Sequence, residues 1–325
     1  MIHITNGDCA AGVIRETDIA GPVIPWRDVL HEGPVPDGLS LDELRAVRAR
    51  FIAVAGWGAF DAVLADLEAR DGALAESRNH DEVVLWFEHD LYDQLQLLQL
   101  LDWFAGPDAG RARVSLVCGA EYLGSSSPAR LRERFPSRHP VSDAQLVLAR
   151  EAWAAFRSPD PTALTDLVTA DTSALPFLRR AIVRHLQQFP SVTAGLSRSE
   201  AQALAAIRRG AVRPSEIYAA SHRDQEEAIF LGDVVFAWYV EGLSRVPEPL
   251  VAWSDGERIA APRSPDDARA FWDREVRLTE AGRRVLDGEA DRVQLNGIDR
   301  WLGGAHLRSP SCWRWDDAAQ RLRGG

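Results

Sequence analysis

Charged side chains able to do acid–base or metal chemistry follow a short apolar run in the first half of the chain. Residues 83–87 are continuously apolar, which is typical of a parallel strand that is buried on both faces. Glu88, His89, Asp90 and Asp93 come directly after this run, where the strand ends and the next helix begins. Because ligands of open α/β sheets bind at the carboxyl ends of strands, the sequence predicts a functional site here.

Two further polar loops follow predicted strands nearer the N-terminus. They supply the remaining candidate residues, which are Asn6 and Asp8 after residues 2–5, and Arg27, Asp28, His31 and Glu32 after residues 22–26. Tyr92 stands beside Asp93 at the start of the predicted helix. If the strands are parallel neighbours, all these loops open on one edge of the sheet. We therefore expect the candidate residues to surround a common crevice.

The mixture of imidazole and carboxylate groups permits two kinds of chemistry. Such donors suit zinc, manganese or non-haem iron, so a divalent metal is the candidate cofactor, although no H-E-x-x-H spacing is present and the metal stays unknown. Alternatively, His89 or His31 acts as a general base while a carboxylate fixes its tautomer. Arg27 is suited to binding a phosphate or carboxylate through two parallel hydrogen bonds.

Each of these residues also has a purely structural alternative. Asp8 is placed to cap the helix predicted at residues 9–16. His31 and His89 can be satisfied by local backbone groups, as most polar groups in loops are. Arg27 can form an ion pair with a neighbouring carboxylate, and Tyr92 can pack in the core. Residue types and spacing alone leave these alternatives open.

The first part of the chain alternates strand-like and helix-like segments, which predicts an α/β fold with a Rossmann-like parallel sheet. The predicted strands cover residues 2–5, 22–26, 83–87 and 113–118. Helices are predicted at residues 9–16, 40–55, 60–75, 91–104, 143–156 and 163–188. This assigns residues 1–140 to the α/β domain and residues 141–190 to a helical connector.

Residues 191–291 have a different pattern, which resembles a winged-helix domain. Helices are predicted up to residue 209, from residue 214 and at residues 224–239, followed by strands at 250–253 and 276–278 and a helix at 279–286. The remaining residues, 292–325, contain three tryptophans and two adjacent glycines. We expect this segment to be a C-terminal tail that docks on another surface to bury its rings.

Charge and composition limit the classes of partner. The chain has 325 residues and a formal net charge of −11, and all of its 37 basic residues are arginine. Between Pro190 and Asp291 there are 13 arginines and 18 acidic residues, a balance that favours protein contact over nucleic-acid binding by the winged helix. No apolar run of membrane-spanning length and no signal-peptide pattern is evident, so a cytoplasmic location is expected.

Three separated motifs resemble a bacterial family catalogued as domain of unknown function 1835. They are His3-Ile-Thr-Asn-Gly-Asp8-Cys-Ala-Ala-Gly12, Pro25-Trp-Arg-Asp-Val-Leu-His-Glu-Gly-Pro34 and Trp86-Phe-Glu-His-Asp-Leu-Tyr-Asp-Gln94. The tail segment Leu295-Asn-Gly-Ile-Asp-Arg-Trp-Leu-Gly-Gly-Ala-His306 is similar to that family as well. The resemblance covers about the first 140 residues and the tail, and it implies no particular reaction.

These observations predict an enzyme, a hydrolase or group transferase, that acts on a small phosphorylated or nucleotide-like substrate. The expected catalytic residues are His89, His31, Glu88 and Asp90. The expected substrate-binding residues are Asp8, Asn6, Arg27, Asp28, Glu32, Tyr92 and Asp93. The alternatives are a ligand-responsive transcriptional regulator that uses the winged helix to bind DNA, and a non-catalytic adaptor that contacts other proteins.

Overall fold

The computed structural model describes residues 1–110 and 112–324, which form two compact units. The first unit contains Met1–Ala53, Gly58–Val183 and Gly303–Ala305. The second contains Val54–Trp57, Arg184–Leu302 and the chain from His306 onward. Among the described residues, no helix is both long and apolar enough to cross a membrane.

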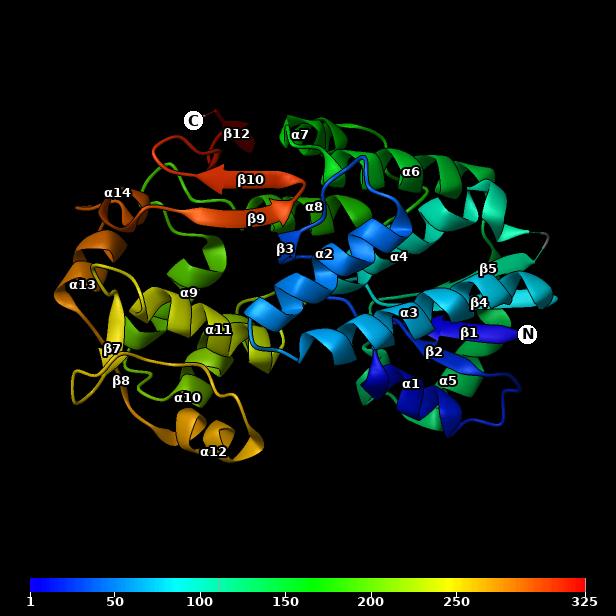
Figure 1. The fold of residues 1–325 in the computed structure, drawn as a ribbon, viewed down its shortest axis with the longest axis horizontal. Helices are drawn as coiled ribbons and strands as arrows, with labels where there is room; N and C mark the ends of the chain where they lie inside the picture. Colours follow the sequence, from blue (N-terminus) through cyan, green and yellow to red (C-terminus); the bar gives the residue numbers. More distant parts are fainter. Residues whose placement is uncertain (111, 325) are drawn as a thin grey trace. The chain divides into compact units, whose positions relative to one another are not determined.

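The first unit is built on a mostly parallel sheet of five strands (Figure 1). These strands are β1 (Ile2–Thr5), β2 (Val23–Pro25), β4 (Glu82–Phe87), β5 (Arg113–Cys118) and β6 (His139–Pro140), in the order β2-β1-β4-β5-β6. The first four are parallel, and the short β6 runs antiparallel to β5. The prediction of a mixed α/β fold with a parallel sheet is therefore confirmed.

Helices cover both faces of this sheet. The helices of the first unit are α1 (Asp8–Arg15), α2 (Leu41–Val54), α3 (Phe60–Glu76), α4 (Leu91–Phe104), α5 (Pro128–Arg134), α6 (Asp143–Arg157), α7 (Thr162–Thr169) and α8 (Leu178–Leu186). Figure 1 shows α1 and α5 on one side of the sheet and α4 and α6 on the other. The single helix predicted at residues 163–188 is wrong, because the chain leaves the helix after Thr169 and Pro176 has no N–H for a continuous ladder.

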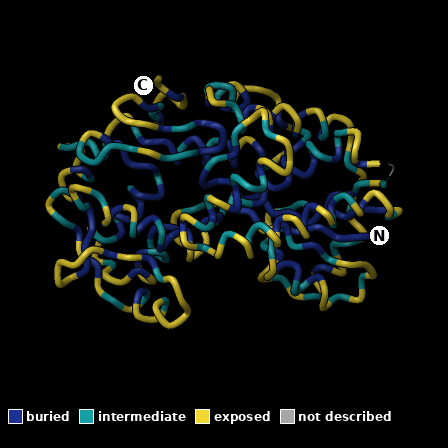
Figure 2. Tube along the Cα trace, viewed as in Figure 1, coloured by how far each residue is buried: buried dark blue, intermediate teal, exposed yellow. Residues whose placement is uncertain are grey.

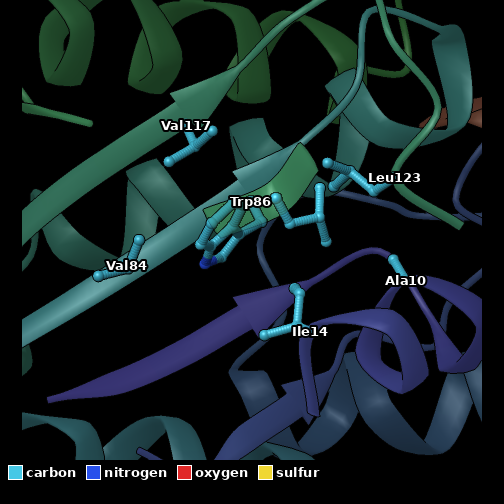
Figure 3. Packing of buried hydrophobic residues seen from close by; sticks show 7 residues of the cluster. Ala10, Ile14, Val84, Trp86, Val117 and Leu123 are labelled. Carbon is cyan, nitrogen blue, oxygen red and sulfur yellow. The ribbon is translucent and has the colours of Figure 1, made fainter. Parts of the chain in front are cut away.

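Apolar side chains from β4 and β5 form a core with α1 and α5. Figure 3 shows Trp86 of β4 among the buried side chains of this cluster, which are Ala10, Ile14, Val84, Val117, Leu123 and Leu131. The indole Nε1–H of Trp86 donates to Nδ1 of His3 over 3.1 Å, and His3 Nε2 lies 3.2 Å from the carbonyl oxygen of Ala20. His3 is therefore a core histidine with a partner at each ring nitrogen, which fixes its tautomer.

The order of the strands creates a switch point between β1 and β4. The chain runs from β1 through α1 to β2 on one side, and from β4 through α4 to β5 on the other. Thr5 pairs with Trp86 in the parallel register, so both strands end at the same edge. In open α/β sheets the crevice at such a point is where ligands bind. Both strands are buried along their length (Figure 2).

The second unit combines helices with short strand pairs. Its elements are α9 (Arg198–Arg208), α10 (Pro214–Tyr218), a π-helical turn (Ala219–Arg223), α11 (Asp233–Ser244), β7 (Val251–Trp253), α12 (Pro265–Asp273), β8 (Val276–Leu278), α13 (Glu280–Leu286), α14 (Arg292–Asn296), β9 (Asp299–Gly303), β10 (Ala305–Arg308), β11 (Arg314–Asp316) and β12 (Arg321–Arg323). Strands β7 and β8 pair antiparallel, as do β11 and β12.

Two features of this unit differ from the prediction. The helix expected at residues 224–239 begins only at Asp233, because Gly232 is its N-cap and the first-turn carboxylate of Asp233 suits a helix N-terminus. Residues 250–253 and 276–278 were expected to form a small hairpin with a turn at residues 254–256; the strands do pair, but helix α12 lies between β7 and β8 in sequence. In the tail, Trp315 is buried, and its backbone exchanges hydrogen bonds with Pro190 and Val192.

Strand β3 (Gly33–Pro34) completes the described elements of the first unit. The N–H of Val35, which follows β3, donates to the carbonyl oxygen of Gly303 over 2.8 Å. Gly303 has a positive φ of 61°, and a Cβ there would lie 2.3 Å from the carbonyl oxygen of Phe156. The backbone approach at this point therefore requires glycine.

Ile14→Ala is expected to lower the free energy of unfolding by about 2–5 kcal/mol, because it leaves a cavity in the core between α1 and β4. Ile14 is 1% exposed, whereas Val147 on α6 is 58% exposed. The control variant Val147→Ala should stay within about 0.5 kcal/mol of the wild type. Urea denaturation followed by circular dichroism measures both changes. Equal effects of the two substitutions would contradict this view of the core.

Candidate functional site

A pocket of about 280 Å³ lies at the carboxyl edge of the sheet in the first unit. Three loops that follow parallel strands line it. The lining residues are Asn6, Gly7, Asp8, Cys9 and Ala10 after β1, Glu88 and Tyr92 after β4, and Tyr122, Gly124 and Ser125 after β5. The pocket therefore lies where the topology places ligands, beside the switch point between β1 and β4.

Three buried carboxyl groups stand together behind this pocket. One oxygen from each of Glu88, Asp90 and Asp93 lies within 4.8 Å of the others. None of the three residues is more than 4% exposed. Carboxylates so close together and so little hydrated repel one another unless protons or a cation are shared among them. The end of β4 is thus a point of concentrated negative charge.

Hydrogen bonds fix the orientation of each carboxyl group. Asp90 is the N-cap of α4 and accepts from the N–H of Asp93 over 3.1 Å. Asp93 in turn accepts from the N–H of Glu88 and from Nδ2 of Asn6, each over 2.7 Å. Glu88 accepts from the N–H of Leu123 over 2.6 Å. The cluster therefore joins the loops after β1, β4 and β5 in one network.

Burial alters the acidity of all three groups. Loss of hydration raises the pKa of Asp90 to about 8, and the neighbouring charge of Glu88 acts in the same direction. Burial also raises the pKa of Asp93 well above its ordinary value, with the charges of Asp90 and Glu88 contributing. The pKa of Glu88 is raised by burial as well, although hydrogen bonds from Leu123 and Asn6 oppose the shift. At neutral pH the cluster retains protons.

The donor set of this cluster differs from the one expected from the sequence. Among the described residues, the group that could hold a cation contains three carboxyl groups and neither His31 nor His89. All-oxygen donors suit magnesium, calcium or manganese rather than zinc or non-haem iron. The short distances between the oxygens fit such an ion, while both oxygens of Asp93 already accept hydrogen bonds from the protein.

The two histidines lie beside the tyrosines of the pocket. His31 is 1% exposed, and its ring meets Tyr92 edge-on with the centroids 5.9 Å apart. His89 is 9% exposed and packs against Tyr122, with 5.3 Å between the centroids, and against Phe177. Neither histidine is among the described residues that line the pocket. Their rings pack against the two tyrosines that line it.

Tyr92 connects the first helical turn of α4 to the loop after β1. Its hydroxyl group donates to the carbonyl oxygen of Asn6 over 3.1 Å. Burial raises the pKa of Tyr92 above its ordinary value, so the phenol stays protonated at neutral pH. The aromatic ring and the amide of Asn6 therefore form a fixed wall of the pocket.

Asp8 and Arg27 form an ion pair at the rim of the pocket. Both hydrogen bonds between the guanidinium and carboxylate groups measure 2.7 Å, and they lower the pKa of Asp8. The capping role considered for Asp8 is wrong, because Gly7 is the N-cap of α1 and none of the side chains that the structure describes caps this helix. Arg27 draws the carboxylate of Asp8 away from the helix end, which leaves the first N–H groups of α1 without a side-chain cap.

Asp28 and Glu32 lie outside the lining of the pocket. Asp28 is 2% exposed and accepts from Nε and Nη2 of Arg48, over 3.0 and 2.8 Å. The same guanidinium group donates to the carbonyl oxygens of Val29 and Glu32. The buried guanidinium group of Arg48 therefore stabilises the loop after β2, and its ion pair with Asp28 has a structural role.

The sequence prediction missed several residues of the pocket. Tyr122, Gly124 and Ser125 follow β5, which was itself predicted at residues 113–118, so the rule applied to the other strands would have found them. Gly124 approaches the loop after β1 so closely that a Cβ would lie 2.9 Å from Cβ of Cys9. The ion pair between Asp28 and Arg48 could not be predicted in this way, because Arg48 lies on a helix that is remote from Asp28 in sequence.

Arg48→Met is expected to lower the free energy of unfolding by about 3–5 kcal/mol, since it leaves the buried carboxylate of Asp28 without its main partner. Arg27→Met is the matched control, because it breaks a pair whose side chains are 49% and 63% exposed and should cost about 1 kcal/mol or less. Denaturant titration at neutral pH compares them. Similar losses in both variants would refute the structural role of Arg48.

Asp90→Asn is expected to make unfolding less dependent on pH. The folded pKa of Asp90, about 8, lies above its unfolded value of about 3.9, so its contribution to stability is fully present below pH 4 and is lost as the pH rises through 8. Asparagine retains the N-cap of α4. The melting temperature should therefore fall less between pH 5 and 9 in this variant than in the wild type.

The matched control for that experiment is Asp143→Asn, which removes an exposed carboxylate from the first turn of α6. This variant should keep the pH profile of the wild type. If Asp90→Asn also keeps it, the carboxyl group of Asp90 is ionised over the whole range and the proton-holding cluster does not exist.

Comparison with known proteins assigns the chain to no group. No family model matches the sequence, and no curated protein matches it either.

Proposed function

We propose that the first unit is an enzyme, a hydrolase or group transferase, whose substrate is a small phosphorylated or nucleotide-like molecule bound beside the switch point of the sheet. The observation that carries this proposal is the position of Glu88. It lines the pocket, its pKa is raised by burial, and two further buried carboxyl groups stand behind it. Titratable groups with shifted pKa values gather at catalytic sites more often than elsewhere.

In this proposal Glu88 is the catalytic acid and base. A carboxyl group whose pKa is raised by burial can donate a proton to a leaving oxygen and, once ionised, accept one from water or a hydroxyl nucleophile. Hydrogen bonds from Leu123 and Asn6 hold it in place. Asp90 and Asp93 are positioning residues, because Asp93 binds the backbone N–H of Glu88 and Asp90 orients Asp93.

The rest of the pocket supports a phosphorylated or nucleotide-like ligand. Cys9 and Ala10 lie in the first turn of α1, whose N–H groups are not capped by a side chain and carry the positive end of the helix dipole. The rings of Tyr92 and Tyr122 offer flat surfaces against which a base or sugar can pack. If a divalent cation replaced the protons shared by the three carboxyl groups, it would polarise a phosphoryl oxygen, and Glu88 would be one of its ligands instead of the acid and base.

We further infer a Rossmann-like arrangement for the first unit and a winged-helix-like arrangement for residues 191–291. The order β2-β1-β4-β5 with helical crossovers supports the first inference. Helices α9 to α11 followed by the antiparallel pair β7–β8 support the second. Helix α11, in the place of a recognition helix, is largely buried and contains Asp233 and Glu241 but no arginine, which favours contact with protein over DNA.

The resemblance to the family of domain of unknown function 1835 remains part of this proposal. Its motif residues Asn6, Asp8, Glu88 and Tyr92 all line the pocket. The motifs therefore coincide with the site that the proposal makes catalytic.

Glu88→Gln is expected to lower kcat/KM by about 10²–10⁴-fold, because the amide cannot exchange a proton with the substrate. Phosphate release from a panel of nucleotides and sugar phosphates, with and without magnesium or manganese, measures the activity. The matched control is Glu121→Gln, which lies in the loop after β5 but forms an exposed ion pair with Arg130. It should retain full activity.

Unchanged turnover in Glu88→Gln would remove the catalytic role of this residue. If neither the wild type nor the control releases phosphate from any compound of the panel, this result would count against a phosphorylated substrate. The pH profile adds a second readout, since the acidic limb of the wild-type profile should disappear in any residual activity of Glu88→Gln.

A further inference from the structure

The second unit contains a larger pocket, of about 520 Å³, with a different character from the one at the sheet edge. It lies between α9, α11 and the segment from α14 into β9, and all of its lining residues belong to this unit. Its volume falls within the range of about 300–1,000 Å³ that small-molecule sites occupy. It does not belong to the proposed catalytic site, and its function has to be inferred separately.

Three arginines surround this pocket in a protein of net charge −11. They are Arg245 at the end of α11, Arg292 in α14 and Arg300 in β9. The two acidic residues of the lining are already engaged by the protein. Glu200 accepts from the backbone N–H of Ser197, and Asp299 lies 2.6 Å from Nε2 of His306. Three guanidinium groups against two carboxylates leave an excess of positive charge in the lining, which favours an anion.

Contacts with the protein hold all three guanidinium groups, and Arg245 pairs with Glu241 over 3.4 Å. Arg300 lies 5.0 Å from the ring centroid of Tyr239 and donates to its hydroxyl oxygen. Arg292 donates to the carbonyl oxygen of Gly297 over 3.0 Å and lies 3.7 Å from Glu200. Guanidinium groups held in this way are already oriented, so a bound carboxylate or phosphate orders few additional side chains.

Aromatic side chains line the same pocket. Trp238 and Tyr239 are neighbours on α11, with ring centroids 5.7 Å apart and nearly perpendicular planes. The guanidinium group of Arg300 already covers Tyr239, whereas Trp238 is partly exposed. The ring of Trp238 also meets Trp57 edge-on, with 5.7 Å between the centroids, and its exposed part can pack against a flat ligand.

Gly242 contributes to the open volume of the pocket. It lies within α11, where glycine is less favourable than alanine, yet a Cβ built on it would meet no atom within 4 Å. The packing of the protein therefore does not require glycine here. Because Gly242 lines the pocket, its missing side chain leaves the volume of the pocket free.

We propose that this pocket binds a small organic anion that contains a flat ring, such as a nucleoside monophosphate or an aromatic carboxylate. The ring packs beside Trp238, and the phosphate or carboxylate group binds between Arg245 and Arg292. The site is independent of the proposed catalytic pocket, because no residue is shared between the two linings. It gives the second unit a ligand-binding role of its own.

Isothermal titration of the full chain with AMP and with benzoate tests this proposal, using inorganic phosphate and adenosine as partial ligands. At least one of AMP and benzoate should bind to one site with a Kd of about 1 mM or lower, and more tightly than either partial ligand. Gly242→Leu, which fills the pocket, should abolish that binding. Leucine favours helix more than glycine does, so the variant should melt no lower than the wild type.

Gly72→Leu is the matched control, because Gly72 also lies within a helix and its Cβ would likewise meet nothing within 4 Å. It should bind as the wild type does. Arg245→Met should weaken binding at least about tenfold, whereas Arg269→Met, which removes an exposed arginine of α12, should have no effect. Glu88→Gln should also leave this site unchanged.

The outcomes separate this proposal from the catalytic one. Binding that survives in Gly242→Leu would place the ligand elsewhere and overturn the proposal. Binding of neither AMP nor benzoate would overturn it too, whatever the activity of the first unit. Loss of binding in Gly242→Leu together with full activity at the Glu88 pocket would establish a second, separate site.

Discussion

The parallel pairing of β1 with β4 is the constraint on which the first unit depends. Thr5 is in register with Trp86, so the loops that leave both strands begin at the same edge of the sheet. Since the chain leaves β1 and β4 toward opposite sides, neither loop crosses the other and a pocket stays open between them. The core around Trp86 holds this register, because a shift of one residue would turn the indole to the other face.

The same arrangement explains why three acidic side chains can be buried together. Each carboxyl group accepts at least one hydrogen bond from the backbone, and Asn6 reaches across from the neighbouring strand end to Asp93. These bonds do not replace full hydration, so the pKa values of all three groups rise. A polar cluster of this kind stabilises the fold only while protons or a cation neutralise part of its charge.

The pocket at the sheet edge and the pocket of the second unit differ in electrostatic character. The pocket at the sheet edge is backed by carboxyl groups, whereas the pocket of the second unit is bordered by three arginines. In each, the charged groups that matter are held by contacts with the protein: Glu88 by Leu123, and Arg300 by Tyr239. This shared feature is what catalytic and binding sites need, because groups that are already oriented lose little freedom when a ligand binds.

The sequence by itself determined the four parallel strands of the sheet and the place of the candidate site, because apolar runs that end on charged residues reflect local chemistry. Residues 113–118 and 91–104 were predicted with the bounds that β5 and α4 have. Only the tertiary structure decided the partners. Arg48 forms an ion pair with Asp28, and Arg27 forms one with Asp8. The rings of His31 and His89 pack against tyrosines. Each of these contacts joins residues that are remote in sequence. The arginine-bordered pocket is likewise a product of folding, because α9, α11 and β9 meet only in the folded chain.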